Sequence, residues 1–220
     1  MEKDLIKLGG KDYFQVLSKK IVLPSSFFGP IKYYSILFNN KNCIIDVYEN
    51  YIKQSIRSRC DLYSSNGKLS ISVPKIRKNS SKTRMKDIKI CYSEDWQKSH
   101  WKTLLSCYNS SPFFDFYKEK IEIIFQKKEK FLIDLNIKSL EIIKDFLKID
   151  RDVYFSKEYI NKTECIDLRL KKFLSSELIS YDQVFSKNCG FINNLSILDL
   201  IFNLGPEAIN IINDKENVKI

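Results

Sequence analysis

The fold is decided by residues 19–47, which read KKIVLPSSFFGPIKYYSILFNNKNCIIDV. The apolar run at the start of this stretch predicts a short buried strand that Pro24 ends, and NCIIDV at 42–47 predicts a second one. Between them a Gly-Pro pair opens the segment 31–40, whose apolar residues recur at helical spacing. A strand, a helix and a strand at this spacing indicate a βαβ unit with a parallel pair of strands.

An Asn-Gly pair at residues 66–67 separates two alternating runs, a strand expected at 54–62 and the run KLSISVP, and so predicts a β-hairpin. A further strand is expected at 85–90. Helical periodicity then dominates the chain, and the remaining expected elements are helices at 93–109, 113–130, 132–148 and 195–205 and short strands at 153–156 and 183–185. The sequence therefore predicts an α/β fold, a mixed sheet with an N-terminal βαβ unit and β-hairpin followed by a mainly helical half. Because no repeat or linker is visible, residues 1–220 are expected to form one domain.

The composition of the chain is that of a globular protein with a basic surface. Lys and Arg number 37 against 27 Asp and Glu, which gives a formal charge of +10 and invites a nucleic-acid interpretation. The abundance of Lys, Ile and Asn beside a single alanine is also typical of an AT-rich genome, which weakens that interpretation. The six cysteines form no C-x-x-C pair, and the first residues are charged throughout, so a reducing, cytoplasmic location is expected. No P-loop, GxGxxG or HExxH motif is present, so neither a cofactor nor a metal is expected.

The most function-like feature is the expected strand at 54–62. Alternation places Ser55, Arg57, Arg59 and Asp61 on one face, with the two guanidinium groups about 7 Å apart. This spacing suits a diphosphate or a carboxylate, because each guanidinium can donate two parallel hydrogen bonds. The alternative is an ordinary exposed sheet face, on which Asp61 and Glu49 are the ion-pair partners.

Two other features carry candidate chemistry. His100 is the only histidine, so it is either the general base or anion ligand of a site, or a histidine packed at the edge of the core. A basic loop at 75–86 either is an ordinary solvated loop, closes over phosphates as a lid, or binds nucleic acid. Its basic residues are Lys75, Arg77, Lys78, Lys82, Arg84 and Lys86.

Several segments together resemble the WbqC-like family of bacterial proteins, especially its members from Bacteroidetes. These are LPSSFFGPIKYYSIL, DVYENYIKQSIRSRC, DWQKSHWKTLLSCYNSSPFF and LSILDLIFNLGPEA, and the resemblance is strongest over residues 21–208. Positions that match the recurrent pattern of the family include Tyr34, Lys53, Arg57, Arg59, His100, Ser196 and Asp199. Members often carry an acidic pair near Asp46, and many carry Asn-Arg where this chain has Ser58-Arg59.

The resemblance implies a role in the biosynthesis of O-antigen and other surface polysaccharides. A transferase that adds glycine or another acyl group to a nucleotide-linked or lipid-linked sugar is expected. In it Arg57, Arg59 and Lys53 would hold phosphate or carboxylate and His100 would accept a proton. The other expected substrate-binding residues are Tyr34, Asp46 and Asp199. Two alternatives are a non-catalytic binding or scaffold subunit of a polysaccharide assembly complex, and a nucleic-acid-binding protein that uses the basic loop.

Overall fold

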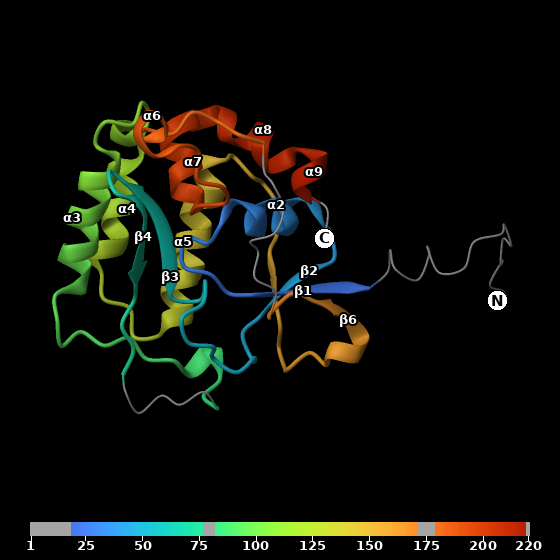
Figure 1. Ribbon diagram of the computed structural model, residues 1–220. Coiled ribbons are helices and arrows are strands. Elements are labelled where there is room, and N and C mark those ends of the chain that lie inside the picture. Colours follow the sequence, from blue (N-terminus) through green and yellow to red (C-terminus); the bar gives the residue numbers. More distant parts are fainter. Residues whose placement is uncertain (1–18, 77–81, 171–178, 219–220) are drawn as a thin grey trace, which may run out of the picture.

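The computed structural model describes residues 19–76, 82–170 and 179–218. Its main sheet consists of four parallel strands in the spatial order β5-β2-β1-β6 (Figure 1). The bounds of these strands are Lys20–Pro24 for β1, Cys43–Asp46 for β2, Tyr154–Phe155 for β5 and Cys165–Asp167 for β6. Because all four strands run in the same direction, their carboxyl ends lie along one edge of the sheet.

The helix α2, Ile31–Asn39, connects β1 to β2, and the two strands pair in parallel, with Ile21 opposite Cys43. The βαβ prediction is therefore confirmed. Most side chains of α2 are buried, because helices near the end of the chain pack over it (Figure 1). These covering elements are α7, Ile197–Leu204, the 3-10 turn η3, Gly205–Glu207, α8, Ala208–Asn213, and α9, Lys215–Val218.

The predicted hairpin is present as a separate two-stranded antiparallel sheet of β3, Arg59–Ser64, and β4, Gly67–Ser72. Gly67 has a φ of 94°, a left-handed conformation that glycine adopts without strain. The first of these strands begins later than expected, because residues 54–58 form turns. The prediction of a strand over 54–58 is wrong, since Gln54 has a φ of 54° and a left-handed residue interrupts a pleated strand.

The helical half follows the predicted order. Its long helices are α3, Trp96–Tyr108, α4, Phe114–Gln126, and α5, Leu132–Phe146. The helix α3 begins later than the predicted residue 93, and its cap is Asp95, whose carboxylate accepts a hydrogen bond from the Lys98 amide. Beyond Gly205 the chain forms two further helices, α8 and α9, which were not predicted.

Two predicted strands are wrong. Residues 85–87 form the 3-10 turn η1, Met85–Asp87, followed only by isolated bridges at Lys89 and Ile90. Residues 183–185 lead instead into the short helix α6, Ser186–Cys189. Both segments are short, and over so few residues the sequence pattern does not separate a strand from other backbone. The strand β6, which follows the 3-10 turn η2, Lys162–Glu164, was not predicted.

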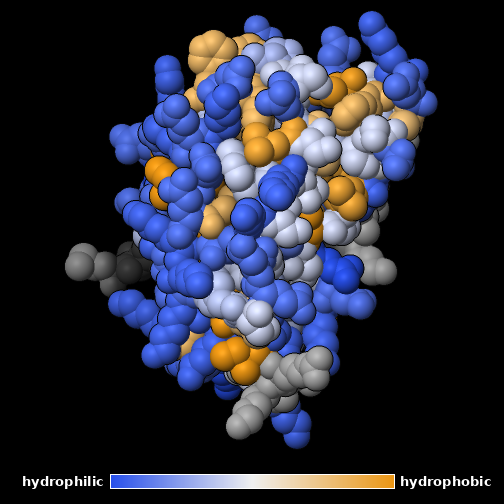
Figure 2. Space-filling view, turned by 90° about the vertical axis from the view of Figure 1, so that its left-hand side faces the viewer, coloured by the Kyte–Doolittle hydropathy of each residue, from blue (hydrophilic) through white to orange (hydrophobic). Residues whose placement is uncertain are grey.

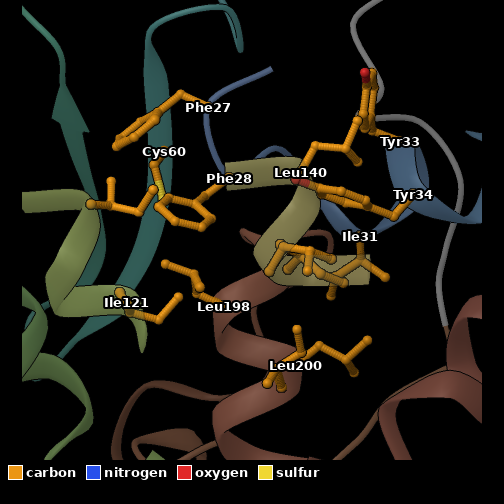
Figure 3. Close-up of a cluster of buried hydrophobic side chains, with 14 of the residues drawn as sticks. Phe27, Phe28, Ile31, Tyr33, Tyr34, Cys60, Ile121, Leu140, Leu198 and Leu200 are labelled. Carbon is orange, nitrogen blue, oxygen red and sulfur yellow. The ribbon is translucent and has the colours of Figure 1, made fainter. Parts of the chain in front are cut away.

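A continuous apolar core joins the sheet, the hairpin and the helices. In Figure 3, Phe28 lies beside Cys60 of β3, and Leu140 of α5 lies beside Tyr34 of α2. Leu198 and Leu200 of α7 extend the same cluster toward α4. The core therefore holds the segment after β1 and the hairpin in fixed positions relative to one another.

The face that carries α3 and α4 is mainly hydrophilic, with apolar side chains in small separate groups (Figure 2). Phe116 on α4 is the most exposed of the large apolar residues of the described chain, at 79%. Scattered apolar residues of this kind are normal on protein surfaces. Among the described residues, none of the helices has both the length and the apolar character needed to cross a bilayer.

Candidate functional site

A pocket of about 540 Å³ opens at the carboxyl edge of the main sheet. Its walls come from the segments that follow β1 and β6, the turns before β3, one face of the hairpin, and the residues just before α7. The central strand β1 has β2 on one side and β6 on the other, and both neighbours are parallel to it. Ligands of open α/β sheets bind at this edge, where connections leave a central strand in opposite directions.

The floor of the pocket is the backbone of residues 28–30, held against the start of α7. The Ser196 hydroxyl donates a hydrogen bond of 2.7 Å to the Phe28 carbonyl, and the Ile197 amide donates one of 2.9 Å to the Gly29 carbonyl. In the other direction, Asn194 Oδ1 accepts a hydrogen bond of 3.0 Å from the Lys32 amide. The first turn of α2 is thus already paired, and its amides do not form an anion site.

Glycine is needed at position 29 because of close packing. A Cβ atom placed there would lie 2.1 Å from the Ser26 hydroxyl oxygen and 3.0 Å from the Ser26 Cβ. Ser26 itself donates a hydrogen bond to the Ile56 carbonyl, which belongs to the turns before β3. The close approach at Gly29 therefore fixes the floor of the pocket to its wall.

Left-handed backbone conformations gather at this pocket. The described chain has four non-glycine residues with positive φ, and three of them line the pocket: Phe28 at 43°, Gln54 at 54° and Asn194 at 55°. The fourth is Lys148. Such residues cost free energy and persist only where the surrounding structure imposes them, often at functional sites. Their concentration here is a signal for function that does not depend on charge.

Arg57 lies at the bottom of the pocket and is almost completely buried, with 2% of its surface exposed. Its Nε donates to Glu49 Oε1 at 2.8 Å, and its Nη2 contacts Glu49 Oε2. Further hydrogen bonds go to the Arg169 carbonyl at 3.0 Å and the Ser55 hydroxyl at 3.2 Å. Burial raises the pKa of Glu49, and the hydrogen bonds from Arg57 act in the opposite direction. Arg57 is thus an ion-paired structural part of the floor.

Arg169 is buried and paired in the same manner. Its Nη1 donates to Asp46 Oδ2 at 2.5 Å, and its Nε and Nη2 donate to the two carboxylate oxygens of Asp167 at 2.8 and 2.9 Å. Asp46 also accepts a hydrogen bond of 2.8 Å from the Ser156 hydroxyl. Because Asp46 ends β2 and Asp167 ends β6, Arg169 joins the ends of two strands that flank β1.

The charged residues of the hairpin wall are only partly paired with one another. Arg59 and Asp61 face the pocket from β3, and Lys68 and Ser70 face it from β4. Asp61 is ion-paired with Lys68 at 2.5 Å and accepts a hydrogen bond of 2.5 Å from the Ser70 hydroxyl. The guanidinium of Arg59, which is half-buried, has no hydrogen-bond or ion-pair partner in the part of the chain that the structure describes.

Lys53 stands at the exposed rim of the pocket, and its ammonium likewise has no partner among the described residues. The positive charge of Lys53 affects Lys75, because burial lowers the pKa of Lys75 and repulsion from Lys53 lowers it further. Among the described residues, Arg59 and Lys53 are therefore the two pocket cations without a partner.

The predicted residues Tyr34 and Asp199 lie outside the pocket lining. Tyr34 is part of the core on α2, and burial raises the pKa of its hydroxyl. Asp199, in the first turn of α7, accepts hydrogen bonds from the Tyr181 hydroxyl at 2.5 Å and from Gln183 Nε2 at 2.9 Å. Burial raises the pKa of Asp199, and these hydrogen bonds lower it. Asp199 thus fixes the segment 181–183 to α7.

His100 also lies away from the pocket lining, on α3. Its ring centre is 5.1 Å from that of Trp96 and 6.5 Å from that of Phe125. Its Nδ1 is buried with no hydrogen-bond partner in the described chain. Burial lowers the pKa of His100 to about 4, so the imidazole is neutral at pH 7.

The sequence interpretation missed several residues of the pocket. Lys68 and Ser70 could have been found from the hairpin register, which places Ser70 opposite Asp61. Arg169 and Asn194 gave no local signal, since each reaches the pocket from a segment far along the chain. Residues 77–81 of the basic loop lie outside the described residues, so the lid and nucleic-acid interpretations stay predictions. No group of three or more His, Cys, Asp or Glu side chains in the described chain could hold a metal ion.

A comparison with protein-family models finds one described as WbqC-like protein family, which matches residues 25–172. This range covers more than half of the chain, and it contains the floor segment after β1, both hairpin strands and Arg169. Neither the curated proteins nor the solved structures give a match.

Proposed function

Because the chain belongs to the WbqC-like protein family, we propose that it is a transferase in the cytoplasmic biosynthesis of bacterial surface polysaccharide. Its substrate is a nucleotide-linked or lipid-linked sugar, to which it adds glycine or another acyl group. The family name is consistent with a role connected with O-antigen. The pocket at the carboxyl edge of the sheet has a volume suited to a small organic substrate.

One observation carries the proposal. Arg59 and Lys53 face the pocket without partners in the described chain, whereas Arg57, Arg169 and Lys68 are each paired with a carboxylate. Unpaired cations in a concave site attract anions, and an arginine side chain can bind phosphate or carboxylate with two hydrogen bonds. A sugar activated by a phosphate carries such an anion.

This arrangement divides the roles first expected of the two neighbouring arginines. Arg59, with Lys53, contacts the anion of the substrate. Arg57 supports the floor through Glu49, as Arg169 does through Asp46. His100 was expected to accept a proton from the attacking amine or hydroxyl group, but it does not line the pocket. We therefore leave it outside the proposed site.

A second function, a non-catalytic subunit that binds a sugar for other enzymes, is favoured by a specific observation. Asp61 is the one carboxylate of the described chain that lines the pocket, and Lys68 and Ser70 already hold it. No described histidine, cysteine or tyrosine lines the pocket. A site of this composition binds anions readily and offers little for general-base catalysis.

Replacement of Arg59 in the cells that make the protein tests the function. Arg59→Ala is expected to change the mass spectrum of the surface glycan, and Lys102→Ala, which removes an exposed charge from α3, is the matched control. Loss of one substituent mass from the repeating unit supports the transferase. Loss of the whole polymer supports the assembly subunit. An unchanged glycan in the Arg59 variant would contradict both.

A further inference from the structure

We propose that the ligand of the pocket is a sugar phosphate, whose phosphoryl group lies between Arg59 and Lys53 and whose uncharged part lies on the floor formed by residues 28–30 and 194–196. The sugar rests on the function proposed above. The phosphate and its orientation rest on the charges and burial of the pocket.

The type of anion follows from the two cations that have no partner among the described residues. Of the five described cations that line the pocket, three are paired with carboxylates: Arg57 with Glu49, Arg169 with Asp46 and Asp167, and Lys68 with Asp61. Arg59 and Lys53 remain, and they come from two different segments of the pocket. A phosphoryl group has three acceptor oxygens, so it can accept two hydrogen bonds from a guanidinium and a third from an ammonium. A carboxylate has two oxygens, and one guanidinium already uses both.

The position of the anion follows from burial. Arg59 lies on the hairpin wall of the pocket and is half-buried, whereas Lys53 is exposed. A guanidinium contacts a phosphate through a planar pair of donors, and an ammonium adds a compact point charge. Lys53 also lies close enough to Lys75 to lower its pKa, so a bound anion would relieve that repulsion. The phosphoryl group therefore belongs at the wall and rim.

The orientation follows from the floor. Asn194 and Ser196 are buried there, and the nearby guanidinium groups of Arg57 and Arg169 are paired with carboxylates. A second anionic group on the floor would have to compete with Glu49, Asp46 and Asp167. An uncharged group with hydroxyls meets no such competition, so the sugar ring is placed on the floor and the phosphate above it.

A sugar phosphate of this kind can come from two sources, and the phosphate on the sugar is common to both. A nucleotide-linked sugar and a lipid-linked sugar both carry phosphate on the sugar, and each continues from the phosphate toward the exposed rim in the proposed orientation. The nucleoside or the lipid then lies near Leu170, which is 62% exposed. The minimal ligand common to both is a hexose 1-phosphate.

Isothermal titration with the full chain at low salt tests the inference. The probes are a set of hexose and N-acetylhexosamine 1-phosphates, the same sugars without phosphate, inorganic phosphate, and glucuronate as the carboxylate analogue. At least one sugar phosphate is expected to bind more than tenfold tighter than its parent sugar and than inorganic phosphate. Arg59→Gln is expected to weaken this binding about tenfold to a hundredfold, the usual effect of losing hydrogen bonds between charged groups. Lys102→Gln, which changes the net charge equally, should leave it unchanged.

Three results would overturn the inference: no sugar phosphate binds, Arg59→Gln binds as tightly as the wild type, or glucuronate binds as tightly as the best sugar phosphate. A uridine diphosphate hexose and a farnesyl diphosphate hexose then distinguish the two sources by which of them binds more tightly than the 1-phosphate. The outcome is separable from that of the proposed function. Tight binding beside an unchanged glycan in Arg59→Ala cells contradicts the function alone, and a changed glycan without phosphate binding contradicts the inference alone.

Discussion

Arg57 and Arg59 are two residues apart, line the same pocket and have opposite surroundings. Arg57 is 2% exposed and donates hydrogen bonds to Glu49, Ser55 and the Arg169 carbonyl. Arg59 is half-buried and its side chain has no partner in the described chain. A buried charge must be paired within the protein, whereas a partly solvated charge needs no internal partner because water stabilises it. The pair therefore separates the part of the pocket that maintains the fold from the part that we propose binds a ligand.

The largest effect is expected from breaking the buried pair. Glu49→Leu leaves the Arg57 guanidinium buried without a counter-charge, and should lower the free energy of unfolding by about 3–5 kcal/mol. Urea denaturation at pH 8, where Glu49 is ionised, measures it. The double variant Glu49→Leu with Arg57→Met removes both charges and should regain most of the loss. A cost below about 1 kcal/mol for Glu49→Leu would show that Arg57 is solvated, and would remove the contrast with Arg59.

A smaller effect is expected from the close contact beneath Arg57. Gly29→Ala forces the new methyl group against Ser26, and should cost about 1–3 kcal/mol in urea denaturation. Ser26→Ala removes the nearest atom. The double variant should therefore lose less unfolding free energy than the sum of the losses of the two single variants. Full additivity would mean that the strain lies elsewhere, and that Gly29 does not fix the floor against its wall.

His100 extends the comparison, because it is a partly buried titratable group without a partner charge. Its folded pKa of about 4 lies below the unfolded value of about 6.5, so the unfolded state binds more protons between these values. The stability that this shift contributes is complete above about pH 6.5 and is lost as the pH falls toward 4. Partial exposure reduces the effect to about 1 kcal/mol between pH 7 and pH 5. Urea denaturation at pH 7 and pH 5 measures it: the free energy of unfolding should decrease less in His100→Gln than in the wild type. Equal decreases in the two proteins would contradict this prediction.

The smallest change in stability is expected at Arg59. Arg59→Gln removes a side chain without partners in the described chain, so the free energy of unfolding should stay within about 0.5 kcal/mol of the wild type. The same variant is expected to lose ligand binding. A large destabilisation would place Arg59 with Arg57 as a structural residue and would undermine the proposed pocket.

Local signals predicted the parts of the fold that depend on few residues. The Asn66-Gly67 turn, the βαβ unit and the long helices follow from turn chemistry and periodicity, and all are present. The prediction of a strand over residues 54–58 was wrong for a local reason that the sequence does not indicate. Gln54, which lines the pocket, adopts a left-handed conformation, and no propensity of glutamine indicates that.

The candidate site depended on tertiary contacts that a single sequence does not give. Alternation placed Arg59 and Asp61 on one face, as the structure has them, and it also placed Arg57 there as an equal partner. Glu49 was expected as an ion-pair partner only in the alternative of an exposed sheet face, and the burial of Arg57 was not predicted. Arg169 follows a three-residue strand, which is too short for any periodic pattern to reveal. The family resemblance was confirmed, and it added Tyr34 and Asp199 as candidates, which lie outside the pocket lining.

The hydrogen bonds that join the floor of the pocket also constrain the order of folding. Asn194 bonds to the Lys32 amide across 162 positions of the chain, and Ser196 bonds to the Phe28 carbonyl across 168. Contacts of such high contact order form late, because a long loop must close before they can contribute. The βαβ unit and the hairpin can collapse from nearby segments while the pocket still lacks its floor. We therefore expect a partly folded or growing chain to lack the proposed binding site, which is completed only when the segment before α7 docks.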